Sequence, residues 1–85
     1  MKVLIPDALR SYTDNANSEA RGATLGEALW DLDRRHPGIR FRMVDEQDRI
    51  RRHIRIFVNG EQLNDLVAPL QPDDDIIIVQ ALSGG

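Results

Sequence analysis

The run Ile76-Ile77-Ile78-Val79 restricts the fold of this chain more than any other feature. Four consecutive β-branched residues after the turn-forming segment Pro72–Asp75 are typical of a strand. Neighbouring side chains of a strand point to opposite faces, so both faces of this strand are apolar. Such a strand is expected at the centre of a sheet, with other parts of the chain covering each side. The 85 residues form one small domain with a limited core.

One segment predicts an amphipathic helix of about three to four turns. Thr24 and Glu27 have the spacing of a capping box, which satisfies two backbone donors at the helix start. His36-Pro37-Gly38 is expected to end the helix. Trp30 is expected to cover an edge of the core. The buried stripe, at the spacing i, i+3, i+4, i+7, consists of Leu25, Ala28, Leu29 and Leu32. The solvent-facing side is expected to hold Asp31, Asp33, Arg34 and Arg35.

The remaining strands are predicted from apolar patterns and turn signals. Lys2–Ile5 predicts a first strand that ends at Pro6-Asp7, and 50–58 predicts another. Asn59-Gly60 is the preferred type I′ hairpin turn, so 61–63 should return antiparallel. Three segments are less regular. The first is predicted as a loop around 12–18 followed by an edge strand near 19–23. The second is predicted as a short helical turn anchored by Phe41, Met43 and Val44, and the third, 65–70, as a helical or irregular crossover.

Together these elements predict an α+β roll, in which one main helix packs across one face of a small mixed sheet. The first and last strands are expected to lie side by side at the centre of that sheet. The whole chain, 1–85, is interpreted as a single domain with a flexible tail over 83–85.

Composition excludes several classes of protein. The chain has no cysteine, which excludes thiol catalysis and thiolate metal sites and favours a reducing, cytoplasmic compartment. A net charge of −3 argues against a general nucleic-acid or anionic-membrane binder. The sequence has no apolar stretch near the ~18 residues of a membrane span. His36 and His53 lie far apart without further ligands, so no metal site is expected.

The chain ends in Gly84-Gly85. Such an ending can be an incidental frayed terminus. Alternatively, a segment without side chains that follows a rigid strand can enter a narrow active-site channel, which any Cβ would block. A terminal carboxylate presented in this way is a substrate, not a catalyst.

The order of these elements resembles the ubiquitin-like sulfur-carrier family, and the resemblance covers nearly the whole chain. Three segments carry it: Thr24–Leu29 at the helix start, Ile56–Glu61 at the hairpin, and Asp74–Gly85 at the end. The resemblance implies the ubiquitin-like β-grasp fold. The chain departs from common family patterns at Asp73-Asp74-Asp75, Gln80 and Ser83, which affects the choice of pathway more than the family.

The resemblance also implies a chemistry. An E1-like adenylating enzyme that uses ATP and magnesium would convert the carboxylate of Gly85 to an acyl-adenylate. A sulfur donor, either a sulfurtransferase or a sulfide source, would then displace the nucleotide to give a thiocarboxylate, which passes sulfur to an acceptor synthase. The chain itself needs no bound cofactor and no catalytic residue. It would be a carrier, or the small subunit of a sulfur-transferring synthase.

The receiving pathway is open among molybdopterin, thiamine, cysteine and a specialised metabolite. The chain is longer than compact thiamine-type carriers, which favours the molybdopterin-like branch. Two other functions stay open: a ubiquitin-like modifier that joins lysines through Gly85, and an interaction module whose glycines are incidental.

A docking surface follows from strand parity. If the isoleucines at 54, 56, 76 and 78 face the helix, then Phe57, Ile77 and Val79 lie on the opposite face. An apolar patch on an uncovered sheet face is a candidate for partner binding, and Leu82 would lie beside the tail. Alternatively, 7–23 or 39–49 covers this face, or the face forms a dimer.

Two charged clusters have simpler interpretations. The triplet Asp73-Asp74-Asp75 is interpreted as a turn, since no further ligand follows at the spacing of a calcium loop. A basic cluster is interpreted as a solvated strand face, with contact to an acidic partner as the alternative. This cluster consists of Arg49, Arg51, Arg52, His53 and Arg55.

Overall fold

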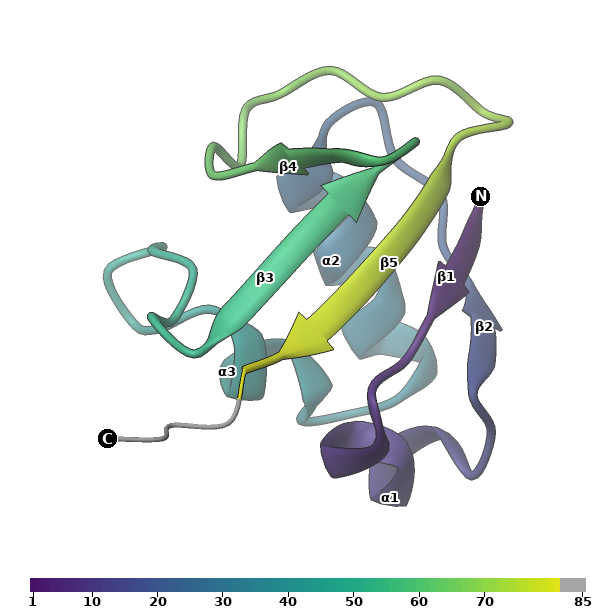
Figure 1. The fold of residues 1–85 in the computed structure, drawn as a ribbon, viewed down its shortest axis with the longest axis vertical. Helices are drawn as coiled ribbons and strands as arrows, with labels where there is room; N and C mark the ends of the chain where they lie inside the picture. Colours follow the sequence, from purple (N-terminus) through teal and green to yellow (C-terminus); the bar gives the residue numbers. More distant parts are fainter. Residues whose placement is uncertain (82–85) are drawn as a thin grey trace.

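The computed structural model describes residues 1–81 as a layer of strands with helices packed against one face (Figure 1). Over this range five strands form one sheet in the order β2-β1-β5-β3-β4. In chain order the elements are β1 (Lys2–Leu4), the 3-10 helix η1 (Asp7–Leu9), α1 (Arg10–Thr13), β2 (Asn17–Glu19), α2 (Leu25–Arg35), α3 (Ile39–Met43), β3 (Ile54–Val58), β4 (Glu61–Leu63) and β5 (Asp75–Gln80). The predicted α+β roll is therefore confirmed.

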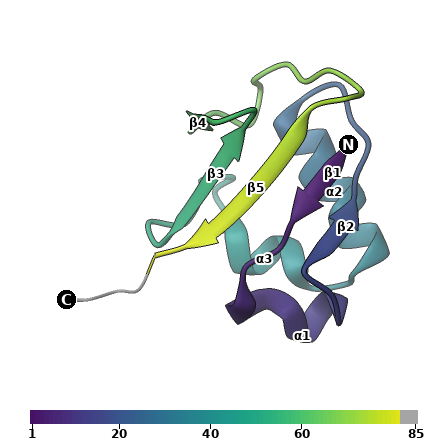
Figure 2. The same cartoon turned by 45° about the vertical axis from the view of Figure 1, so that its right-hand side comes forward.

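Strand β5 lies at the centre of the sheet, as predicted. It pairs in parallel with β1 and antiparallel with β3. Ile76 and Ile78 are buried beneath α2, whereas Ile77 and Val79 are 38% and 40% exposed on the other face. The expectation that both faces would be covered is wrong, because α2 and α3 lie behind the sheet and η1 and α1 lie at its lower end (Figure 2).

Helix α2 begins as predicted. The Thr24 side chain accepts a hydrogen bond from the Glu27 N–H, and the Glu27 carboxylate accepts one from the N–H of Ala23. Two further N–H groups of the first turn donate to carbonyls of the crossover that follows β4, Leu25 to Ala68 and Gly26 to Leu66. The helix start is thus tied to the crossover, which is irregular and not helical.

Asp31 departs from the prediction, because it is buried and not on the solvent-facing side of α2. The segment before the helix passes over it, and the N–H of Arg21 donates to its carboxylate at 2.8 Å. Arg35 donates to the same carboxylate at 3.0 Å, and Arg34 pairs with it as well. Burial raises the pKa of Asp31, but these hydrogen bonds and charges outweigh burial and lower the pKa from 3.8 to about 2.

We expect the Asp31→Asn substitution to cost about 2 kcal/mol of stability at pH 7, because a tenfold change in proton affinity corresponds to about 1.4 kcal/mol. Because the pKa of Asp31 is lower in the folded than in the unfolded state, its ionised form stabilises the fold at pH values above the unfolded-state pKa. This stability is lost as the pH falls from about 4 to about 2. Urea unfolding of both proteins at pH 7 and at pH 2.5 measures the difference. If the difference in unfolding free energy between the two proteins is as large at pH 2.5 as at pH 7, the stabilising role of the Asp31 charge is contradicted.

Two large aromatic side chains lie outside the core, contrary to prediction. Trp30 and Phe41 are 58% and 57% exposed. Helix α3 is anchored by Ile39 and Met43, and Val44 follows it into the core. The guanidinium of Arg40 stacks on the Trp30 ring, 3.8 Å from its centroid. Trp30 is therefore held in place from one side and open on the other.

Several boundaries differ from the predicted ones. β2 ends at Glu19, just where the edge strand was expected to begin, and η1 and α1 were not predicted. β3 begins at Ile54 and not at 50, because the preceding residues form a loop closed by hydrogen bonds from Asp45 N–H to Arg49 O and from Arg51 N–H to Met43 O.

Candidate docking face and activated terminus

The outer face of the sheet carries a row of apolar residues across its three central strands. Leu4 of β1 lies opposite Ile77 of β5, which lies opposite Phe57 of β3. Side chains at such paired positions share a face. Val79 lies further along β5, opposite Arg55. The structure therefore brings together Phe57, Ile77 and Val79, the three predicted docking residues that it describes.

Leu4 was missed by sequence reasoning. It is 39% exposed and extends the patch onto β1, while its neighbours Val3 and Ile5 are buried. The first strand is apolar at consecutive positions, so its pattern does not show which side chain faces outward. Pairing with β5 supplies that information. We call the four residues Leu4, Phe57, Ile77 and Val79 the outer patch.

A groove of about 410 Å³ runs beside the outer patch. One wall is formed by the second half of β5, up to Gln80, and the other by the segment from Leu4 to Arg10. Neither 7–23 nor 39–49 covers this face within residues 1–81, because Leu4, Ile77 and Val79 are exposed. The patch and groove are thus open up to the last residue of β5.

The end of β5 is firmly held. Gln80 pairs with Ile54, and the N–H of Ala81 donates to the carbonyl of His53 at 2.7 Å. Ala81 is the last residue that the structure describes. The predictions for Leu82, Gly84 and Gly85 lie outside the described residues.

The start of β5 is held by Asn59 and Asp74. The Asn59 side chain donates to Asp74 at 2.8 Å and accepts from the N–H of Asp75 at 3.0 Å. A hydrogen bond from the N–H of Gln71 and the one from Asn59 lower the pKa of Asp74. Asp74 thus closes the turn into β5, which confirms the interpretation of the acidic triplet as a turn.

The Asn59→Gly and Asn59→Ala substitutions should separate the two roles of this residue. Asn59 has a φ of 51° and Gly60 one of 86°, as a type I′ turn requires. Glycine keeps that backbone geometry but removes both side-chain hydrogen bonds, at about 1–2 kcal/mol. Alanine should cost about 1 kcal/mol more, because its Cβ disfavours a positive φ. Urea unfolding measures both. Equal stability of the two variants would contradict the turn argument, and a wild-type value for the glycine variant would contradict the anchoring of β5.

The basic cluster does not form a strand face. Arg49, Arg51 and Arg52 lie in the loop before β3, and only Arg55 lies within a strand. Within residues 1–81, no group of three or more His, Asp or Glu side chains is arranged to hold a metal ion. Over the same range, no helix is both long enough and apolar enough to cross a membrane.

Comparison with known proteins identifies the family. The sequence matches the profile of the ThiS family over residues 3–85. Curated relatives from Mycobacterium tuberculosis and Mycobacterium bovis, each named sulfur carrier protein CysO, are 33% identical over 89 aligned residues. The alignment covers 98% of this chain and 96% of theirs.

Solved structures agree with the sequence comparison. CysO in the BexX/CysO complex of Amycolatopsis orientalis is 36% identical, with a TM-score of 0.90 over 99% of this chain and 98% of that one. CysO of Mycobacterium tuberculosis, described as an antigen, is 30% identical, with a TM-score of 0.89 over 95% of this chain and 98% of that one. SAMP1 of Haloferax volcanii is 25% identical, with a TM-score of 0.80 over 100% and 98%.

These relatives do not support the preference for a molybdopterin-type carrier, which rested on chain length alone. They do support the sulfur-carrier assignment, because the matching carriers align with this chain over nearly the full length of both. The β-grasp architecture is shared as well. The chain therefore belongs to the ThiS family and is a ubiquitin-like sulfur carrier.

Proposed function

We propose that sulfur is carried as a thiocarboxylate on Gly85. The observation that carries this proposal is the family match, which extends through the terminal Gly84-Gly85. In the first step an oxygen of the Gly85 carboxylate attacks the α-phosphorus of ATP, held with magnesium by an E1-like enzyme, and pyrophosphate leaves. In the second step hydrosulfide attacks the acyl carbon and AMP leaves with the electron pair of the broken C–O bond. Loss of the thiol proton gives the thiocarboxylate.

In this proposal the chain is a protein substrate and not an enzyme. The activating enzyme supplies the ATP site and the magnesium, and the carrier supplies a held strand end followed by a short segment. Leu82–Gly85 follows Ala81, and four residues span at most about 14 Å. The end of β5 must therefore lie close to the partner's active site.

The outer patch is our candidate for the surface that docks on the activating enzyme, together with Leu82 in the segment that follows. Burying exposed apolar side chains stabilises a complex, and such patches mark interaction sites. Leu4, Ile77 and Val79 are the exposed members of the patch, and the adjoining groove reaches the end of β5. An enzyme seated on this face would be beside the segment it has to activate.

For the receiving pathway we propose cysteine synthesis, one of the four possibilities that the sequence left open. The support is the similarity to the CysO carriers over almost the whole chain. Transfer of isotopically labelled sulfur from the loaded carrier into free cysteine, in an extract of the source cells, would test this step. Label recovered in molybdopterin and not in cysteine would overturn it.

The intact mass of the protein tests the sulfur-loading proposal directly. The chain is incubated with ATP, magnesium, sulfide and an activating enzyme, and the expected product has one oxygen exchanged for sulfur. Omitting ATP is the control. Neither an adenylate nor a mass change, with an enzyme shown to be active on its own carrier, would overturn the proposal. Adducts joined to lysines of other proteins, without free thiocarboxylate, would favour the modifier.

A further inference from the structure

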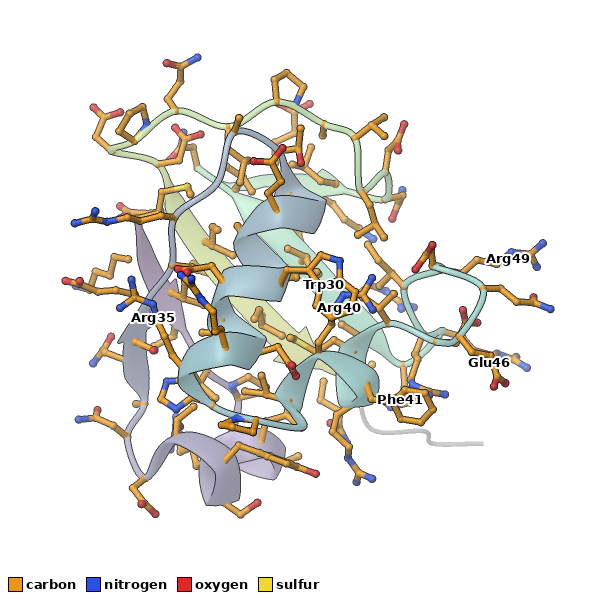
Figure 3. All side chains as sticks on the ribbon, turned by 180° about the vertical axis from the view of Figure 1, so that it is seen from behind. Trp30, Arg35, Arg40, Phe41, Glu46 and Arg49 are labelled. Atoms are coloured by element: carbon orange, nitrogen blue, oxygen red, sulfur yellow. The ribbon has the colours of Figure 1, made fainter. Side chains whose placement is uncertain are left out.

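A second concave surface lies beside the edge of the sheet formed by β3 and β4 and extends to Trp30 on the helix side. It is a cleft of about 740 Å³ between α2, the loop before β3 and the segment that follows β4. Trp30 and Arg40, which both line the cleft, lie side by side, and the loop that carries Glu46 and Arg49 extends beyond them (Figure 3). The sulfur-carrier chemistry uses none of these residues.

Part of the cleft lining is apolar. Val67 is 72% exposed, and the exposed Trp30 lines the same cleft. The Arg40 guanidinium stacks on Trp30 and pairs with Asp48 at 3.1 Å, which orients the indole. A large aromatic side chain held in this way needs little further ordering when a partner binds. Tryptophan and arginine are also the residue types that contribute most at protein interfaces.

The cleft lining is also basic, because five arginines line it against two acidic residues, Asp48 and Asp65. Residues 40–55 contain six arginines and three acidic residues, a local net charge of +3, so the rest of the chain carries −6 within the total of −3. Arg49, Arg51, Arg52 and Arg55 line the cleft, and none of them has an ion pair within residues 1–81. The Nε atom of Arg40 is buried without a hydrogen-bond partner in the described structure.

We propose that this cleft binds an acidic segment of a partner protein. Carboxylates of the segment would pair with Arg49 and Arg52, and a large apolar side chain would pack against Trp30 and Val67. Charge complementarity supports this occupant, since the lining combines an excess of arginines with exposed apolar side chains. Opposite charges across an interface speed association and select the partner. Nucleic acid fits less well, because Trp30 is the one aromatic side chain that lines the cleft among the described residues.

The cleft lies near the end of β5, so a partner bound in the cleft could act together with one bound to the outer patch. Arg51 also lines a smaller pocket of about 250 Å³ that includes His53 and Gln80, the last residue of β5. The basic region therefore extends from the cleft to the strand end that precedes the terminal segment. A partner holding the cleft would lie beside that end while the outer patch stays open.

Trp30 provides the readout, because it is the single tryptophan of the chain. The full chain is titrated with a peptide of alternating glutamate and leucine, and with a matched lysine-leucine peptide. We expect the acidic peptide to shift the Trp30 emission to shorter wavelength with saturation, and affinity to fall as salt is added. No saturable shift up to millimolar peptide, or an equal response to the basic peptide, would overturn the proposal.

Charge-reversal variants locate the contact. Arg49→Glu and Arg52→Glu change exposed side chains that make no hydrogen bond within residues 1–81, so both variants should fold. Each variant should bind the acidic peptide with an affinity about five- to tenfold lower than that of the unchanged chain. Lys2→Glu is the matched control, since it makes the same charge change at an exposed position on β1, outside the cleft and away from Trp30. Equal binding by all three variants would exclude the cleft.

Two further measurements distinguish cleft binding from sulfur loading and from nucleic-acid binding. A chain lacking Gly85 should bind the peptide as the full chain does, so a failure of sulfur loading and a failure of cleft binding are told apart. Oligouridylate is titrated in parallel. Tighter binding of the oligonucleotide than of the peptide would replace the acidic-segment proposal with nucleic-acid binding.

Discussion

Deletion of Gly85 is expected to abolish thiocarboxylate formation. The chain would then end at Gly84, and its carboxylate would lie about 3.5 Å short of the position at which the activating enzyme adenylates it. Acyl transfer requires reacting atoms about 3–3.5 Å apart, and a misplacement of about 1 Å can cost 100-fold, so a whole-residue shift should leave no measurable product. Intact mass after incubation with ATP, magnesium, sulfide and the activating enzyme measures the loss.

Two substitutions accompany this deletion. Gly84→Ala adds one Cβ at the penultimate position and should lower the rate strongly if the terminus enters a narrow channel. Ser83→Ala is the matched control, since it makes a change of similar size one residue earlier and should be nearly neutral. Sulfur loading of the deletion variant at the wild-type rate would show that the activated group is not the carboxylate of Gly85.

The second large effect is expected for Ile77→Asp. Ile77 lies in the middle of the outer patch, between Leu4 and Phe57. Docking would bury the new carboxylate without a partner, and such a charge costs several kcal/mol. We therefore expect kcat/KM of the activating enzyme for this carrier to fall by about 100-fold or more. Steady-state adenylation, followed by pyrophosphate release, measures the change.

Folding and location need separate controls for this substitution. The Ile77 side chain faces outward, so the loss of stability should be about 1 kcal/mol, the range of strand propensities. A second variant, Leu4→Ser, alters the same row of side chains on another strand. Gln71→Glu places the same charge at an exposed position outside both the outer patch and the cleft, and it should leave adenylation unchanged. Full activity of Ile77→Asp with loss of activity in Val67→Asp, which alters the cleft, would place the enzyme on the cleft side.

Local signals predicted the elements on which the candidate site is built. The capping box at Thr24 and Glu27 correctly located the start of α2 because both hydrogen bonds form within one turn. Asn59-Gly60 correctly predicted the hairpin because few residue pairs adopt two consecutive positive φ values. The alternation along β3 and β5 correctly separated buried from outward-facing residues, since side chains of a strand repeat every second position.

Predictions failed where the environment of a residue depends on a distant segment. Asp31 has the spacing of a solvent-facing residue, but the N–H of Arg21 binds it from a segment that precedes the helix. Trp30 was expected to cover an edge of the core, but it is exposed and its ring packs against Arg40 from α3. The short helices η1 and α1 have too few turns to show an apolar period.

By itself, the sequence determined that β5 is apolar on both faces, that one capped helix packs on the sheet, and that the chain ends in Gly84-Gly85. Only the tertiary structure decided that α2 covers a single face and leaves Ile77 open beside Leu4 and Phe57. It also decided that the arginines before β3 line the same cleft as Trp30. Alternation along a strand defines two faces, but which segment covers each face is determined by packing between residues far apart in the chain.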